Sequence, residues 1–222
     1  MEPSQHEREA MKGFTSRVRT LTAMIAVLAF AAAAAPAANA GLLVTTAQGC
    51  DAAQVSKPFS RWGDANNYTP VPGGSFEAGS AGWSMTGGGK VVGGNEPYYV
   101  RGAGDTKSLF LPQGATATSP SICVGLEDPS LRWLAKQSGA LLGLTGSMTV
   151  EVLFESSLGV TLAAPIGAGL LSTSWQPSIP GVVLANLLPL MPGQQTAVAF
   201  RFRALTGNWN VDDVYVDPMQ RW

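Results

Sequence analysis

The chain has 222 residues, of which 45% are hydrophobic and only 13% charged, and its formal net charge at pH 7 is −1. Lys and Arg form no cluster, which excludes nucleic acid as an expected partner because phosphate binding needs a concentrated positive field. The one histidine, His6, lies in a segment that we expect to be removed, which excludes Ser-His-Asp catalysis and imidazole metal sites from the mature protein.

The N-terminal segment has the pattern of a cleavable export signal. Arg17 and Arg19 precede an apolar run over 21–35, which is too short to span a bilayer comfortably. The small residues at 38–40 have the spacing that a signal peptidase reads. We therefore expect residues 1–40 to be a signal peptide and the rest to be secreted or held in the cell envelope, without stable membrane insertion. The sequence leaves two starts open, Met1 and Met11.

Residues 41–72 are predicted to form an N-terminal arm that a disulfide ties to the domain. Cys50 and Cys123 are the only cysteines, and an even count in an exported chain indicates a bridge. Closing a loop of this length would stabilise the fold by roughly 4 kcal/mol in the chain-entropy model. The bridge favours an ordered arm, although the stretch before residue 68 is rich in turn formers. A lipid-modified Cys50 is the alternative, which is disfavoured because Ala47–Gly49 lack the pattern of a lipobox.

The rest of the chain alternates between short strand-like runs and turn residues. Strands are expected at 83–85, 90–92, 108–111, 115–124, 131–137, 147–154, 160–164, 181–184, 195–204 and in the last run, which ends at 218. The glycines at 87–89 predict a hairpin between the first two of these runs. The run 147–154 alternates only in part, which is typical of a strand in the middle of a sheet. The fold class is therefore all-β, a sandwich or barrel.

Residues at both ends of the predicted domain resemble those of a known family. They are Gly74, Ser75, Phe76, Glu77 and Trp83 upstream, and Trp209, Val211, Asp212, Asp213, Val214, Val216 and Pro218 in the last run. Together they resemble the jelly-roll sandwiches of the galactose-binding-like and carbohydrate-binding-module superfamily. The resemblance implies one jelly-roll β-sandwich over 73–222, with 73–77 as a first strand beside the last one. The middle of the chain matches only in strand rhythm.

An immunoglobulin-like sandwich is the alternative fold. Trp62 lies between Cys50 and Cys123 much as in that fold, but Ser121 stands where its tyrosine is expected. Trp62 also lies among turn residues, whereas that fold needs it in a core strand. We therefore favour the jelly roll.

Asp212 and Asp213 are adjacent carboxylates inside an apolar strand. Alternation directs them to opposite faces, so one would face the interior and need a cation or hydrogen-bond donors. In the modules that the sequence resembles, a structural calcium is often held between the Phe-Glu segment and an Asp on the last strand, which corresponds to Glu77 with Asp212 or Asp213. Calcium prefers such oxygen ligands. The alternative is that the inward carboxylate pairs with an arginine such as Arg203 or with backbone amides.

Carbohydrate binding would rely on exposed aromatic faces that stack on sugar rings. Trp83, Trp133 and Trp209 lie in apolar, strand-like sequence and are assigned to the core. The candidates for a ligand surface lie among turn residues and are Trp62, Tyr68, Tyr98, Tyr99 and Trp175.

The favoured function is therefore a secreted, non-enzymatic binding module for a polysaccharide or cell-surface glycan. A structural or protein-interaction domain of the cell envelope with no sugar site is the first alternative. A glycoside hydrolase is the second, because that chemistry needs only two carboxyl groups. No spacing singles out a pair among the carboxylates that could serve, Glu77, Glu96, Asp105, Glu127, Glu151 and Glu155.

Overall fold

The computed structural model describes residues 55–125, 130–138, 146–155, 160–169, 172–182 and 195–217. All of them belong to Gly41–Trp222, the larger of the two units into which the chain divides. The predicted signal peptide and Cys50 lie outside the described residues, so cleavage and the disulfide stay predictions. Within the described ranges, no helix is long and apolar enough to cross a membrane.

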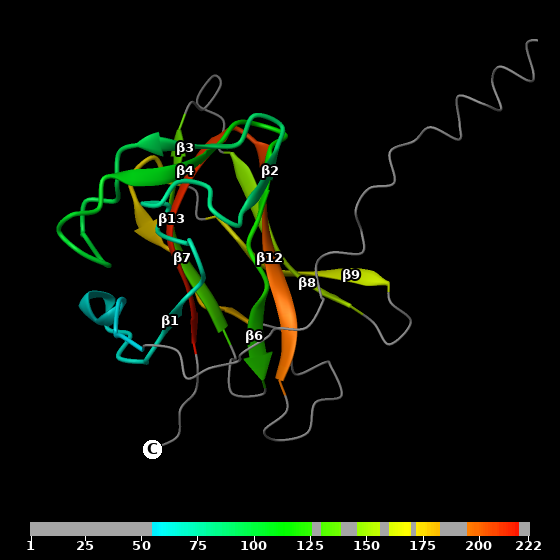
Figure 1. The fold of residues 1–222 in the computed structure, drawn as a ribbon. Helices are drawn as coiled ribbons and strands as arrows, with labels where there is room; N and C mark the ends of the chain where they lie inside the picture. Colours follow the sequence, from blue (N-terminus) through cyan, green and yellow to red (C-terminus); the bar gives the residue numbers. More distant parts are fainter. Residues whose placement is uncertain are drawn as a thin grey trace, which may run out of the picture. The chain divides into compact units, whose positions relative to one another are not determined.

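Two antiparallel sheets pack face to face, which confirms the predicted all-β jelly-roll sandwich (Figure 1). The first sheet has the order β10 (Gln176–Pro177), β7 (Ser130–Ser138), β13 (Asn208–Asp217), β4 (Lys107–Leu111) and β3 (Lys90–Gly93), with β1 (Thr69–Pro70) beside β13 and β11 (Gly181–Val182) beside β7. The second has the order β2 (Ser84–Thr86), β5 (Thr116–Thr118), β12 (Gln195–Thr206), β8 (Ser147–Glu155) and β9 (Thr161–Ala168), with β6 (Ile122–Gly125) beside β12. A 3-10 helix, Ser60–Trp62, precedes β1.

Apolar side chains from the inner faces of both sheets fill the core. Trp83, Trp133 and Trp209 are all buried there, as predicted. Trp133 of the first sheet meets Phe202 of the second edge to face, with 5.5 Å between ring centroids. Each such side chain contributes about 1.5–3 kcal/mol when it is fully buried. The core therefore joins the two layers through large aromatic rings.

Most predicted strands are found at their predicted positions. The run 147–154 forms β8, which lies between β12 and β9 as its weak alternation predicted. The run 115–124 is interrupted, because Ser119–Ser121 with Pro120 separate β5 from β6. Pro165 is tolerated in β9 because, among the strands that the structure describes, β9 lies at the edge of its sheet.

The predicted hairpin at 87–89 is wrong. β2 pairs with β5 in the second sheet, whereas β3 pairs with β4 in the first. Gly87 and Gly88 have φ values of 64° and 85°, which allow the chain to turn sharply and pass from one sheet to the other. The turn chemistry was identified correctly, but it makes a corner of the sandwich.

The segment 73–77 forms turns and is not the strand that the resemblance implied. It nevertheless lies against the last strand, as expected. The Val71 amide donates to the Val214 carbonyl at 2.9 Å, and the Val214 amide donates to the Gly74 carbonyl at 3.1 Å. These bonds form where β13 leaves its regular pairing with β7.

A β-bulge at that point shapes the last strand. The register with β7 shifts between Asp212 and Tyr215, and Asp213 has the left-handed φ of 48°. An extra residue in a bulge breaks the period of two. The alternation that predicted opposite faces for Asp212 and Asp213 therefore does not hold.

The immunoglobulin alternative is not supported. Trp62 lies in the 3-10 helix and is only half-buried, whereas that fold requires a tryptophan in a central core strand.

We expect Gly74→Ala to lower the free energy of unfolding by about 1–3 kcal/mol, because the new methyl group would lie 3.0 Å from the carbonyl oxygens of both Val71 and Val214. Gly93→Ala is the matched control, since nothing lies within 4 Å of its Cβ position. Urea unfolding measures both. Equal effects of the two substitutions would contradict the close contact between this segment and β13.

Candidate functional site

The outer face of the first sheet is covered by residues 55–68 of the predicted arm, which lie on the side away from the second sheet (Figure 1). Leu134 and Tyr215 face outward because they alternate with core residues. Phe59 and Tyr68 pack on this surface, with 5.8 Å between the rings of Phe59 and Tyr215. Ser56 and Tyr68 close the segment on itself through two backbone hydrogen bonds of 2.9 and 2.7 Å.

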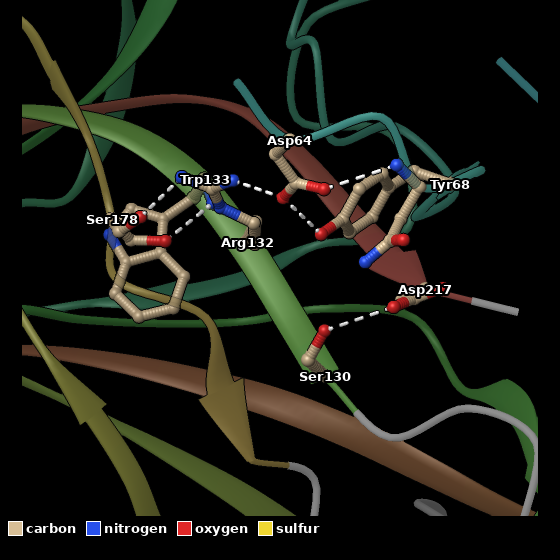
Figure 2. Close-up of polar contacts among 8 residues, drawn as sticks. Asp64, Tyr68, Ser130, Arg132, Trp133, Ser178 and Asp217 are labelled. Carbon is tan, nitrogen blue, oxygen red and sulfur yellow. Dashed lines mark hydrogen bonds and ion pairs between the residues drawn. The ribbon is translucent and has the colours of Figure 1, made fainter. Parts of the chain in front are cut away.

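Arg132 of β7 anchors this segment (Figure 2). Its side chain is 7% exposed, and its Nη1 forms an ion pair with the Asp64 carboxylate. Nη2 donates to the Ser178 carbonyl at 2.8 Å, and the guanidinium lies 4.3 Å from the Phe59 ring centroid. The Tyr68 hydroxyl donates to the same carboxylate of Asp64 at 2.7 Å. A buried cation is thus matched by an anion, a carbonyl and an aromatic face.

The contacts of this anchor shift the pKa values of Asp64 and Tyr68. Burial acts to raise the pKa of Asp64, but hydrogen bonds from Tyr68, Asn66 and Arg132 outweigh it, and the pKa lies below its ordinary value. Burial and the bond to the Asp64 carboxylate raise the pKa of Tyr68 to about 12. The anchor is therefore formed by ionised Asp64 and neutral Tyr68 at neutral pH.

Four of the five aromatic candidates gather around this anchor. The rings of Trp62 and Tyr98 meet edge to face with centroids 4.9 Å apart, and the Tyr98 hydroxyl donates to the Trp175 carbonyl at 3.0 Å. Tyr68 and Trp175 are only 0% and 6% exposed, so their predicted role is corrected to packing beneath the surface. Trp62 and Tyr98 are half-buried, and Tyr99 is 53% exposed with a left-handed φ of 51°.

Two cations lie over these rings, and the sequence analysis did not identify either. The exposed Arg61 places its guanidinium 5.5 Å from the ring centroid of Trp62 and 4.9 Å from that of Tyr98. Its Nη1 donates to the Tyr98 carbonyl at 3.2 Å. Lys136 of β7 places Nζ 5.0 Å from the Trp175 ring centroid. Arg61, Trp62, Tyr98 and Lys136 together are called the outer surface below.

A row of three polar residues and Phe110, called the polar row below, crosses the sheet beside the outer surface. The register pairs Lys90 with Phe110, Phe110 with Asn210, and Asn210 with Lys136. Two hydrogen bonds fix the Asn210 side chain. The Ser138 hydroxyl donates to its Oδ1 at 3.1 Å, and its Nδ2 donates to the Ser108 hydroxyl at 3.3 Å. The row thus combines fixed polar groups with a lysine at either end.

The loop between β3 and β4 carries Tyr98, and buried carboxylates position it. The Glu96 carboxylate accepts hydrogen bonds from the amides of Tyr98 and Val100, the latter at 2.6 Å. The Glu96 amide donates to Asp212 at 3.4 Å, and the Asp213 amide donates to the other Asp212 oxygen at 2.9 Å. The sequence analysis left open that the inward carboxylate pairs with backbone amides instead of a cation. Asp212 does accept hydrogen bonds from two backbone amides. Arg203 lies 4.0 Å from Glu151 on the second sheet.

The bulge buries both aspartates of the last strand. Burial, with the neighbouring charge of Asp213, raises the pKa of Asp212 to about 9. Burial, with the charges of Glu96 and Asp105, raises the pKa of Asp213 to about 7. The charge and the backbone amide of Arg101 oppose this rise of the Asp213 pKa, but neither carboxylate oxygen of Asp213 has a partner in full hydrogen-bond geometry.

The predicted calcium ligands differ in how free their oxygens are to bind a cation. Glu77 accepts hydrogen bonds from the amides of Thr106 and Lys107 at 2.9 and 2.7 Å, and these bonds outweigh partial burial and lower its pKa. Asp105 interacts electrostatically with both Glu77 and Asp213, and its Oδ2 is buried without a partner. Within the described ranges, no three acidic, cysteine or histidine side chains are grouped closely enough to hold an ion as they stand.

Of the carboxylates offered for hydrolysis, Glu77 and Asp105 interact with each other, and Asp105 and Glu96 both interact with Asp213. Glu151 lies on the second sheet, where it accepts a 2.6 Å bond from Arg201. Glu96 lies buried at the first sheet, with its carboxylate bonded to two amides. Glu127 lies outside the described residues, as does the side chain of Glu155.

No family model matches the chain, and no curated protein matches it. Among solved structures, the chain is similar to a xylan-binding family 22 carbohydrate-binding module from Paenibacillus barcinonensis, at 14% identity over 67% of this chain and 93% of that one, with a TM-score of 0.46. It is also similar to the family 22 module and catalytic module of a Clostridium thermocellum xylanase complexed with xylohexaose (13% identity, 67% of this chain, TM-score 0.47).

The similar region spans 28% of that xylanase chain. A third similar structure is tailspike protein 4 of bacteriophage CBA120, at 15% identity over 65% of this chain and 20% of that one, with a TM-score of 0.43. Similarities at this level assign no ligand to this chain.

We expect Asp64→Asn to lower the free energy of unfolding at pH 7 by about 3 kcal/mol, because it leaves the buried Arg132 without an anionic partner. Since the pKa of Asp64 is lower in the folded chain than in the unfolded one, this contribution is complete above the unfolded pKa of about 4 and is lost as the pH falls through the lower folded pKa.

Urea unfolding of both proteins over a pH series measures this difference. It should be constant from neutral pH to about 5 and shrink below about 4, while groups common to both proteins cancel. A difference that persists undiminished at about pH 2 would contradict the ion pair.

Proposed function

We propose that this protein is a secreted, non-enzymatic binding module that recognises a polysaccharide or cell-surface glycan through its outer surface. The observation that carries the proposal is that Trp62 and Tyr98, which are distant in the sequence, meet at 4.9 Å on one face of a rigid sheet. Aromatic rings beside fixed polar groups are the usual means by which proteins bind sugars.

The construction of this surface supports a role in binding. Tyr68 and Trp175 are buried beneath it, and the buried anchor of Arg132 and Asp64 holds the segment that supplies Trp62. A preorganised surface loses less conformational freedom when a ligand binds. Tyr99 lies next to Tyr98 and is more than half exposed, so it offers further aromatic area.

We expect Trp62→Ala and Tyr98→Ala each to weaken binding to a recognised polysaccharide by about tenfold or more, which corresponds to about 1.4 kcal/mol, because each removes aromatic contact area. A panel of insoluble and soluble polysaccharides, followed by isothermal titration, measures this. Leu205→Ala is the matched control, since that side chain is 46% exposed but belongs to β12 of the second sheet.

Absence of binding to every member of a broad panel would contradict the proposal and favour a protein-interaction domain. Hydrolysis of a recognised polysaccharide would contradict the non-enzymatic assignment.

We also propose that calcium stabilises the region around the bulge, with a ligand set that is shifted from the predicted one. Asp213 and Asp105 offer three buried carboxylate oxygens without hydrogen-bond partners, which a hard cation would satisfy. Glu77 fits less well because amides already occupy its oxygens. A bound cation would neutralise the buried carboxylates and so fix the loop that carries Tyr98.

Under this proposal, a chelator should lower the melting temperature by about 5 °C, and excess calcium should restore it. Asp213→Asn should remove the response to the chelator, because it replaces one of the two unpartnered oxygens with an NH2 group and removes the negative charge. Glu151→Gln on the second sheet should keep the response. An unchanged melting curve of the wild-type protein in chelator would reject the calcium site.

A further inference from the structure

Several cations of the outer face have no acidic partner. The ion pairs that the described residues form involve Arg132, Arg201 and Arg203, and Arg61 and Lys136 take part in none of them. The same holds for Lys90, at the far end of the polar row. Unpaired cations gathered on one face create a local positive field, although the whole chain has a net charge of −1.

The acidic residues in the described part of this region form no ion pair with Arg61 or Lys136. The Glu96 carboxylate is bonded to the amides of Tyr98 and Val100, and Glu96 and Asp212 are both fully buried. Asp64 is already paired with Arg132. A ligand that approaches the face therefore meets cations and aromatic rings.

The guanidinium of Arg61 is held in a defined orientation. It lies over the rings of both Trp62 and Tyr98, and one of its N–H groups donates to the Tyr98 carbonyl. A guanidinium has five donors, so the remaining ones are directed at solvent or at a ligand. Because the cation lies over these rings, a sugar that approaches their faces first encounters a rigid, planar donor group.

Such a donor group matches a carboxylate. The planar fork of arginine binds a carboxylate through two parallel hydrogen bonds, and these are about twice as strong as bonds between neutral groups. Lys136 provides a second cation beside Trp175, whose carbonyl is bonded to the Tyr98 hydroxyl. A neutral polysaccharide would leave both cations without a partner.

We propose that the outer surface selects polysaccharides that carry anionic groups, and specifically the carboxylates of uronic acid residues, with Arg61 as the main contact and Lys136 as a second. This inference rests on the proposed carbohydrate-binding function and names its substrate class. Sulfate esters would supply the same negative charge, so the test must separate the two sources.

Isothermal titration should compare glucuronoxylan, polygalacturonate and alginate, each with its carboxyl-reduced form, and dextran sulfate with dextran. At least one carboxylated polysaccharide should bind about tenfold more tightly than its reduced form. That preference should decrease as salt is added, because the contact lies at the surface.

Arg61→Gln should abolish most of this preference, Arg61→Lys should retain part of it, and Lys136→Gln should reduce it. Arg203→Gln is the matched control, because it removes one positive charge from the second sheet. The melting temperature of Arg61→Gln should stay close to that of the wild type, since the side chain is exposed and its contacts are one surface hydrogen bond and two ring contacts.

Equal binding of charged and reduced forms would overturn the selectivity for anions and leave the proposed function intact. Arg61-dependent binding of dextran sulfate alone would overturn the assignment to carboxylates. Absence of binding to all members, charged and neutral, would overturn both this inference and the proposed function.

Discussion

The outer half of this protein depends on the buried guanidinium of Arg132. A cation on the outer face of a sheet strand would be costly to cover unless its hydrogen bonds and charge were satisfied. Asp64 supplies the opposite charge, the Ser178 carbonyl accepts a hydrogen bond and the Phe59 ring covers the guanidinium, while Nε is buried without a partner. Phe59 and Asp64 come from the segment 55–68, which is remote from Arg132 and Ser178 in the sequence. The ion pair thereby fixes residues 55–68 on the sheet and sets the position of Trp62 above it.

The bulge in β13 performs a related task on the neighbouring part of the face. It directs the backbone of Val214 toward the segment 71–74 and buries Asp212 and Asp213 beneath the loop that carries Tyr98. A φ of 48° at Asp213 is a backbone conformation that costs free energy. Such a conformation persists only when the surrounding structure enforces it. Here the surroundings are the backbone of residues 71–74, which bonds to Val214, and the Glu96 amide, which bonds to Asp212. The loop that carries Tyr98 is thereby held beside the bulge, and the Tyr98 ring contacts Trp62 of the anchored segment 55–68.

The sandwich could be predicted from the sequence because strand alternation and turn residues are local signals. The burial of Trp83, Trp133 and Trp209 followed from their apolar neighbours in the same way. The pairing of β2 and β3 with different sheets could not be predicted, since it depends on tertiary packing beyond the turn at 87–89.

The site was predicted only in outline. Its aromatic residues were chosen for their turn context, which does not distinguish the buried Tyr68 from the half-exposed Trp62. Arg61 was not identified as a site residue, and Asp105 was considered only for hydrolysis, because their contacts with Tyr98 and Asp213 join segments that are remote in the chain. The sequence showed that Asp212 and Asp213 are adjacent carboxylates in an apolar strand. It did not predict the bulge that turns both toward Glu96, because a strand with regular alternation has no such bulge.

The central claim is that residues 55–68 are a fixed part of the binding face and not a loose leader. Amide hydrogen exchange of the full chain, with and without a recognised polysaccharide, tests it most directly. We predict slow exchange at Ser56 and Tyr68 in the free protein, because each amide bonds to the other's carbonyl. Added protection on binding should be confined to the segment around Trp62 and the loop around Tyr98. Free exchange throughout 55–68, or protection only on the second sheet, would contradict the account.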